Sequence, residues 1–225
     1  MHAERAAFGR LRGRRWNVER EARTAMRDLL KKKLAASIAT LQAVLADDAL
    51  ADAMMAAARL TSDAMKAGNK LLIAGNGGSA ADAQHLAAEF VCRLTVDRPA
   101  MPAIALTTDT SILTAMGNDL SYDSVFERQL EALGCPGDVF LAISTSGNSS
   151  NLVRALKLSR QKGLVTVGFT GNRGGAIAAL CDVRVIVPSD VTMHIQEAHL
   201  ALEHIFCTLV ERMYFGASFD KVPGA

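Results

Sequence analysis

From Leu71 onwards, short uninterrupted hydrophobic runs alternate with longer amphipathic stretches. The runs predict five β-strands, over residues 71–74, 103–107, 139–144, 166–170 and 183–187. Most of them are apolar at every position rather than at alternate ones, as expected for a sheet covered on both faces. Helices are predicted between and after the strands, over residues 79–94, 111–116, 122–133, 149–162, 175–180 and 192–214. The alternation predicts an α/β fold with a five-stranded, doubly wound parallel sheet.

The residues ahead of the first strand show helical spacing instead. Residues 18–46 carry a broad apolar face, and residues 49–66 form a second helix that ends at Gly68, a common helix stop. Together they predict an N-terminal helical hairpin. We expect residues 1–26 to be a basic, arginine-rich extension, poorly ordered or helical. Residues 27–225 should form a single domain that includes the hairpin.

The last predicted helix carries a seam of apolar residues at alternating spacings of three and four. The seam runs through Ile195, Ala198, Leu202, Ile205 and Leu209. This spacing is typical of helix–helix packing. The partner is either the N-terminal hairpin of the same chain or a helix of another subunit in an oligomeric bundle.

Composition narrows the function classes. The net charge of the 225 residues is +2, too close to zero to argue for a nucleic-acid partner. No stretch approaches the ~18 uninterrupted apolar residues of a membrane span. The four cysteines show no CxxC spacing, which suits a reducing cytosol. We therefore expect a cytoplasmic protein that binds neither nucleic acid nor membrane.

Two glycine- and serine-rich turns follow directly after predicted strands. The first is Gly75-Asn76-Gly77-Gly78, and the second runs from Ser144 to Ser149 with the sequence STSGNS. A strand-to-helix turn presents unpaired backbone N–H groups and the positive end of a helix dipole, so it binds anions well. Alternatively, Ser79 and Ser149 are ordinary helix N-caps. Two such turns at the carboxyl ends of parallel strands favour a phosphate-bearing ligand.

The first turn also matches the dinucleotide fingerprint, since Gly75, Gly77 and Ala80 have the spacing G-x-G-x-x-A. That signal is weak by itself. The acidic residue expected ~20 positions later, at the end of the second strand, is absent. Asp97 lies in a loop and Asp109 falls well past that distance. We therefore expect no nucleotide cofactor.

The helix after the first turn carries a polar ridge that includes His85 and Glu89, four residues apart. One interpretation is a solvated ridge with a Glu89–Arg93 ion pair, worth a few tenths of a kcal/mol. The other is an acid–base or metal-ligand pair. Because the ridge leaves directly from the phosphate-type turn, we expect it to face the ligand.

Longer motifs occur in a fixed order along the chain. They are AGNGGSAADAQH from Ala74, DRP from Asp97, ALTTDTSILTAMGND from Ala105, AISTSGNS from Ala142, FTGNRGG from Phe169 and IQEAHLALEH from Ile195. These motifs, from about residue 35 to residue 215, resemble the sugar isomerase (SIS) domain family, and within it the isomerases of heptose phosphates. The resemblance implies a flavodoxin-like sheet. Two departures are the N-terminal extension and Met193, where some members carry an aspartate.

The resemblance implies an aldose–ketose isomerase. It would convert sedoheptulose 7-phosphate to glycero-manno-heptose 7-phosphate, the first step towards nucleotide-activated heptose for bacterial surface glycans such as lipopolysaccharide. By motif, Glu89 is the base that moves the proton between C1 and C2, and His204 is its acid–base partner. The implied substrate contacts are Asn76, Gly77, Gly78, Glu89, Asn118, Asp119 and Gln196 for the sugar, and Ser144, Thr145, Ser146 and Ser149 for the phosphate. Some members bind zinc at the positions of His85, Glu89, Gln196 and His204.

The family also implies a homotetramer with active sites between subunits, and helix geometry bears on this point. Gln196 and His204 are eight residues apart, which is ~12 Å along a helix and ~80° in rotation. If both side chains serve one small site, we expect them to come from two subunits. His194 and His199 lack such a motif and are assigned structural roles.

Three other functions are compatible with parts of the pattern. A related protein of this fold binds the bacterial replication initiator, but it lacks the catalytic glutamate and histidine that are present here as Glu89 and His204. A sugar-phosphate-sensing domain usually adjoins a DNA-binding domain. An isomerase of a five- or six-carbon sugar phosphate would share all the motifs, since sugar length is set by pocket shape.

Overall fold

The computed structural model describes residues 2–216, with side chains from residue 22 onwards. The chain divides into two compact units, Met1–Ala39 and Thr40–Ala225. Helix α1 (His2–Leu45) accounts for the first unit and continues into the second. The arginines before residue 22 therefore lie outside the described side chains. The packing of the two N-terminal helices as a hairpin stays a prediction.

The second unit contains the five strands that the hydrophobic runs predict. They are β1 (Leu71–Gly75), β2 (Ala103–Ala105), β3 (Val139–Ser144), β4 (Val165–Gly171) and β5 (Val183–Val187). The helices are α2 (Asp48–Lys66), α3 (Gly78–Val91), α4 (Thr110–Asp119), α5 (Val125–Leu133), α6 (Ser150–Gln161), α7 (Gly175–Ala178) and α8 (Thr192–Phe215), with a 3₁₀ turn η1 (Tyr122–Ser124) before α5. All strand pairs are parallel, in the order β2-β1-β3-β4-β5. The predicted doubly wound sheet is confirmed.

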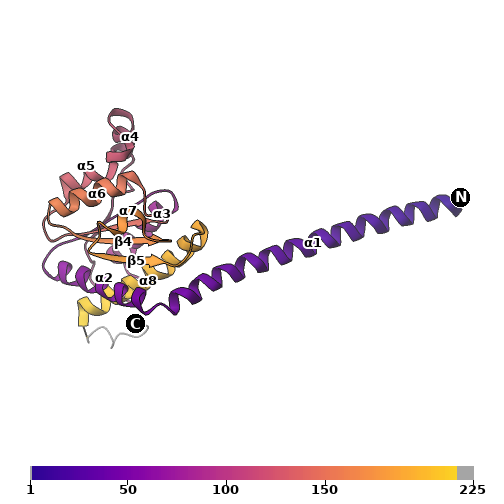
Figure 1. Ribbon diagram of the computed structural model, residues 1–225, viewed down its shortest axis with the longest axis horizontal. Helices are drawn as coiled ribbons and strands as arrows, with labels where there is room; N and C mark the ends of the chain where they lie inside the picture. The colour runs from indigo at the N-terminus through magenta and orange to yellow at the C-terminus, as the bar shows by residue number, and fades with distance from the viewer. Residues whose placement is uncertain (1, 217–225) are drawn as a thin grey trace. The chain divides into compact units, whose positions relative to one another are not determined.

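Helices cover the sheet on both faces (Figure 1). Successive strand side chains point to opposite faces, so Leu71 and Ile73 pack with α2, α3 and α8. Leu72 and Ala74 pack with α4, α5, α6 and α7 on the other side. Because both layers are hydrophobic, the central strands are buried at every position. This explains the continuous apolar runs in the sequence.

The strand order reverses direction between β1 and β3. Strand β1 pairs with β2 on one side and with β3 on the other, and Gly75 at the end of β1 is opposite Ile143 of β3. In doubly wound folds, ligands bind in the crevice at this reversal, outside the carboxyl ends of the strands. The two glycine- and serine-rich turns both leave from this point.

Helix α8 lies against α2 and α3, and its predicted seam is partly confirmed. Ile195, Ala198 and Leu202 are buried, whereas Ile205 is 50% exposed. Its place in the core is taken by Phe206. Ile205 therefore does not pack within its own chain, because over three turns the ideal helical period drifts away from a strict alternation of three and four. Its packing against another subunit stays a prediction.

No single helix among the described residues is long and apolar enough to cross a membrane. Residues 22–45 and α2 reach the length and apolar content of a membrane span only when they are taken together, and the two helices are bent relative to each other.

Candidate active site

The first turn brings α8 against the start of α3. Helix α3 begins at Gly78, one residue before the predicted Ser79, and its N-cap is Gly77 with φ of +59°. Ser79 is buried inside the helix, so it is not a capping residue. A Cβ on Gly78 would lie 2.1 Å from Nε2 of Gln196. Glycine is therefore required at residue 78 for Gln196 to reach the turn.

The second turn leaves its hydroxyl groups available at the start of α6. Ser149 is the N-cap residue by position, but its side chain makes no capping hydrogen bond. Its Oγ lies 3.1 Å from Oγ of Ser144 instead. Ser144 Oγ also accepts a hydrogen bond from the backbone N–H of Gly147, while Ser146 Oγ accepts one from Asn148. An N-cap alone does not account for this arrangement, which favours anion binding.

The FTGNRGG segment supports the second turn from behind. Gly147 has φ of +66°, and a Cβ there would lie 2.1 Å from the carbonyl oxygen of Gly174. The backbone N–H of Gly171 donates to Thr145 O, and that of Ile177 donates to Gly147 O. The close approach of two backbones fixes the turn and makes glycine necessary at residue 147.

An amide pair joins the two turns. Asn76 and Asn151 exchange two hydrogen bonds of 2.9 Å through their side-chain amides. The hydroxyl of Tyr122 donates to Oδ1 of Asn76 over 3.1 Å. Sequence reasoning missed Asn151 and Tyr122. The adjacency of β1 and β3 at the strand-order reversal was the available signal for Asn151, because residue 151 starts the helix after the second turn.

His85, Glu89 and His204 converge at one point beside the middle of α3. The Nε2 atoms of His85 and His204 are 2.8 Å apart, and Nε2 of His85 is 3.5 Å from Oε1 of Glu89. One ligand atom from each of the three side chains lies within 4.8 Å of the others. The side chain of His85 is 43% exposed and that of Glu89 is 18% exposed, so the cluster is open to a small molecule. No Glu89–Arg93 ion pair occurs among the described residues.

Within one chain, Gln196 and His204 contact different points along α3. His204 lies beside His85 and Glu89 of its own chain. Gln196 contacts Gly78 at the start of α3, and His204 contacts His85 two turns later. The helices α3 and α8 thus run side by side in the same direction. That both residues serve one small site only from two subunits stays a prediction, since the contacts of one chain separate them along α3.

Two further carboxyl groups lie close to the histidines. Glu203 is fully buried, and burial, aided by the neighbouring charge of Asp82, raises its pKa to about 8. Burial likewise raises the pKa of Asp82, an effect that His85 partly offsets. Burial therefore favours the protonated, neutral form of the Glu203 carboxyl. Glu89 is the acidic side chain that faces both imidazoles.

The two histidines that were assigned structural roles have contacts of that kind. His199 is fully buried and its Nε2 lies 3.1 Å from the carbonyl oxygen of Thr170. Burial lowers its pKa to about 4, although the bond to Thr170 opposes the shift. His194 lies 3.1 Å from Oε2 of Glu197 on the same helix.

The cluster fits a divalent metal ion of the zinc type. Two imidazole nitrogens and a carboxylate oxygen form an N₂O donor set, which suits zinc. Around a tetrahedral zinc ion, ligand atoms lie roughly 3.3 Å apart. The two Nε2 atoms, at 2.8 Å, would need to separate by about 0.5 Å to bind zinc at that spacing. Gln196 is the remaining predicted ligand, and the structure places it at Gly78.

Asn118 and Asp119, at the end of α4, are not brought to this site within one chain. Both are exposed, and Asn118 Nδ2 donates to Oδ1 of Asp119 over 2.7 Å. Within residues 22–216, no hydrogen bond or ion pair joins either side chain to the two turns or to the histidines.

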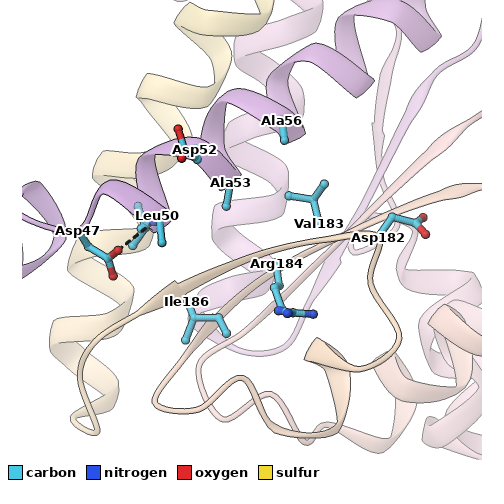
Figure 2. A pocket seen from close by; sticks show the side chains of 10 residues that line it. Asp47, Leu50, Asp52, Ala53, Ala56, Asp182, Val183, Arg184 and Ile186 are labelled. Atoms are coloured by element: carbon cyan, nitrogen blue, oxygen red, sulfur yellow. Dashed lines mark hydrogen bonds between the residues drawn. The ribbon is translucent and has the colours of Figure 1, made fainter.

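A separate hollow of about 600 Å³ lies between the start of α2 and the edge strand β5 (Figure 2). Asp47, Asp52, Asp182 and Arg184 are the charged residues on its walls. Asp47 already caps α2, since its Oδ1 accepts a hydrogen bond from the N–H of Leu50. None of the lining residues belongs to the two turns or to the histidine cluster, so the hollow is not the predicted site.

Comparisons with known proteins give one domain family, several relatives in sequence and similar solved structures. The sequence model of the SIS domain matches residues 34–171. A phosphoheptose isomerase from Aneurinibacillus thermoaerophilus is 51% identical over 197 residues, which are 88% of this chain and 100% of that protein. One from Burkholderia pseudomallei is 54% identical over 184 residues, or 80% of this chain and 93% of that protein. The solved phosphoheptose isomerase of Neisseria gonorrhoeae is similar with a TM-score of 0.78 and 41% identity, over 83% of this chain and 98% of that chain.

Proposed function

The chain belongs to the SIS domain family, and from that premise we propose that it converts sedoheptulose 7-phosphate to glycero-manno-heptose 7-phosphate. It is an aldose–ketose isomerase, and the phosphoheptose isomerases that it resembles support a role in heptose biosynthesis. The observation that carries the proposal is the cluster that His204 of α8 forms with His85 and Glu89, which lie on the helix that leaves the first turn. An isomerase needs such an acid–base pair within reach of a bound sugar phosphate.

The phosphate is assigned to the second turn. Ser144, Thr145, Ser146 and Ser149 offer hydroxyl donors, and the backbone N–H groups at the start of α6 add the positive end of its dipole. The support for this assignment is the Ser149 hydroxyl, which does not cap its helix. The phosphate contacts add no charged side chain, so the helix terminus supplies the electrostatic attraction.

The sugar extends from the second turn towards the first. Asn76, Gly77 and Gly78 line that path, and Gln196 approaches it at Gly78. The hydrogen bonds from Asn151 and Tyr122 to Asn76 fix the orientation of its amide. Asn118 and Asp119 are assigned to the sugar by motif alone, and their exposure leaves them able to serve a neighbouring subunit.

Glu89 and His204 divide the proton transfers. Glu89 takes a proton from C1 of the ketose while the O2 carbonyl oxygen gains one, which forms an enediol. The proton that Glu89 holds then passes to C2, and O1 loses its proton to complete the aldehyde. His204 carries the protons between O1 and O2, because an imidazole exchanges protons near neutral pH.

Zinc is the proposed metal, held by His85, Glu89 and His204. Gln196 is the fourth ligand that the motif implies, and since Gln196 of the same chain lies at Gly78, it would come from a neighbouring subunit. When bound, it would polarise the sugar carbonyl and stabilise negative charge on the enediol oxygens. A carboxylate that binds a cation tightly is a weaker base. The zinc content of the protein must therefore be measured together with its kcat.

The zinc assignment predicts the behaviour of His85→Ala. We expect the wild-type chain to bind about one zinc ion, since the donor set is of the zinc type. The variant should bind zinc more than about tenfold more weakly. Loss of a side chain that only orients a metal ligand already lowers the affinity by at least about tenfold, and His85 is proposed as a ligand itself. Competition with a chromophoric chelator measures this affinity. His194→Ala is the matched control and should bind zinc normally. Equal affinity of His85→Ala and the wild type would remove His85 from the ligand set.

The phosphate assignment predicts a change in KM for Ser149→Ala. A hydrogen bond to a charged group contributes about 1.5–3 kcal/mol, so KM should rise about tenfold or more with little change in kcat. Steady-state kinetics measure both. Ser159→Ala, on the same helix, removes a hydroxyl that bonds Ala155 O and should leave KM unchanged. If Ser149→Ala only lowers the melting temperature, the hydroxyl stabilises the turn through its contact with Ser144 and is not a phosphate ligand.

A homotetramer with active sites between subunits remains part of the proposal. Large apolar side chains stay exposed on the second unit, among them Leu120 at 68% and Ile205 at 50%. Exposed apolar patches commonly mark contacts between proteins. The four cysteines are free, which supports the proposed cytoplasmic location.

Sugar length is tested directly by an assay of the purified chain with ketose phosphates of seven, six and five carbons. We expect the seven-carbon substrate to have the highest kcat/KM. If the chain prefers a shorter ketose phosphate, the proposed mechanism still holds but the proposed substrate is wrong.

A further inference from the structure

Arg98 binds the C-terminal end of the helix that carries Glu89. Its Nη2 donates to the carbonyl oxygen of Glu89 over 2.7 Å, and its Nη1 donates to that of Phe90 over 2.6 Å. The last four carbonyl groups of a helix have no partner within the helix. Since α3 ends at Val91, both acceptors are of this kind. The guanidinium group therefore holds the turn on which Glu89 lies, at the end where a helix frays.

The same guanidinium group is tied to α8. Its Nε and Nη2 donate to Oε1 of Glu211 over 2.7 and 2.6 Å, and the two side chains are only 3% and 1% exposed. Cys207 lies next to the pair: burial raises the pKa of its thiol to about 12, the charges of Glu211 and Glu89 raise it too, and Arg98 lowers it. Glu89, Arg98 and Glu211 are thus close neighbours inside the protein.

Three contacts align α3 with α8. Gln196 meets Gly78 at the first turn of α3, His204 meets His85 in the middle, and Glu211 is joined through Arg98 to the last turn. The first two contacts involve side chains that the proposed reaction uses. The third is buried and does not reach the sugar. It fixes the relative position of the two helices at the end nearest Glu89.

We propose that Arg98 and Glu211 are positioning residues that hold the Glu89 carboxylate against His204. This inference rests on the proposed roles of those two residues. A misplacement of about 1 Å lowers catalysis about 10²-fold even when it originates away from the reacting atoms. Lysine would not replace Arg98, because a single ammonium group lacks the planar fork that reaches a carboxylate and two carbonyl groups together.

The decisive variant is the double substitution Arg98→Met/Glu211→Met. Removing one partner would leave a buried charge unpaired, whereas replacing both by apolar side chains often preserves stability. We expect the double variant to fold, with kcat lower by about 10- to 100-fold and KM within about threefold of wild type, because the phosphate turn lies on another strand. A purely stabilising ion pair would leave kcat unchanged in the folded double variant, and that result would overturn the proposal.

Two further variants complete the test. Arg154→Met/Glu127→Met removes an Arg–Glu pair that joins α6 to α5 on the other face of the sheet, and its kcat should equal that of wild type. If Arg98→Met/Glu211→Met does not fold, Arg98→Lys decides: a wild-type kcat overturns the proposal, and a reduced kcat with unchanged KM supports it.

The inference and the proposed function fail in different ways. If Glu89→Gln keeps wild-type activity, the proposed function fails and the positioning role with it. If Glu89→Gln is inactive but Arg98→Met/Glu211→Met is fully active, the positioning role alone is wrong.

Discussion

Glu89→Gln should lower kcat by about 10²- to 10⁴-fold, the range that a positioned general base contributes. The substitution keeps the shape of the side chain and removes its ability to accept a proton from carbon. Glu89 lies 3.5 Å from Nε2 of His85 and is mostly buried, so solvent cannot readily take over its task. Phosphate binding should persist, because the second turn leaves from β3 rather than from α3. Steady-state kinetics and calorimetric binding of sedoheptulose 7-phosphate measure the two effects.

The control for Glu89→Gln is Glu131→Gln on α5. Glu131 pairs with Arg128 at the surface, where both side chains are more than half exposed. An exposed pair contributes little to stability, so this variant should match wild type in kcat, KM and melting temperature. If the Glu89→Gln variant has the kcat of wild type, Glu89 is not the base.

His204→Asn should also lower kcat by about 10²- to 10⁴-fold, since it removes the proposed proton carrier between O1 and O2. The Nε2 atom of His204 lies 2.8 Å from that of His85, and asparagine cannot exchange protons near neutral pH. The zinc affinity should fall as well, because His204 is one of the three clustered donors. Rapid-quench or continuous assays give kcat, and chelator competition gives the affinity.

The control on the same helix is His194→Asn. His194 contacts Glu197 and belongs to neither the cluster nor the turns, so any loss should appear in the melting temperature rather than in kcat. If the His204→Asn variant keeps its activity, water or another side chain transfers the proton between O1 and O2, and the role proposed for His204 is wrong.

The fold was predictable because its signal is local. Each buried strand, such as Val139–Ser144, is a continuous apolar run, and both layers of helices follow from that pattern. Helix starts were less predictable. The helix α3 begins at Gly78 rather than at Ser79, because the backbone of Gly77 adopts a positive φ that a sequence pattern does not reveal.

The candidate site was predictable where motifs carry it and unpredictable where the contacts are distant in sequence. His85, Glu89 and His204 were predicted from motifs, and the structure brings their side chains together. That His204 meets His85 and Glu89 within one chain depends on the parallel packing of α3 and α8, which no spacing within α8 encodes. Tyr122 and Arg98 act through partners that are 46 and 113 residues away. Their roles required coordinates.

The most direct test of the central claim is the reaction of the purified chain with sedoheptulose 7-phosphate in D₂O, followed by NMR. Proton transfer by a carboxylate through an enediol exchanges with solvent. The account predicts an aldose heptose phosphate that carries deuterium at C2, and no such product from Glu89→Gln. No aldose product with or without zinc, or no deuterium at C2 even after repeated turnovers have brought the reaction to equilibrium, would contradict it.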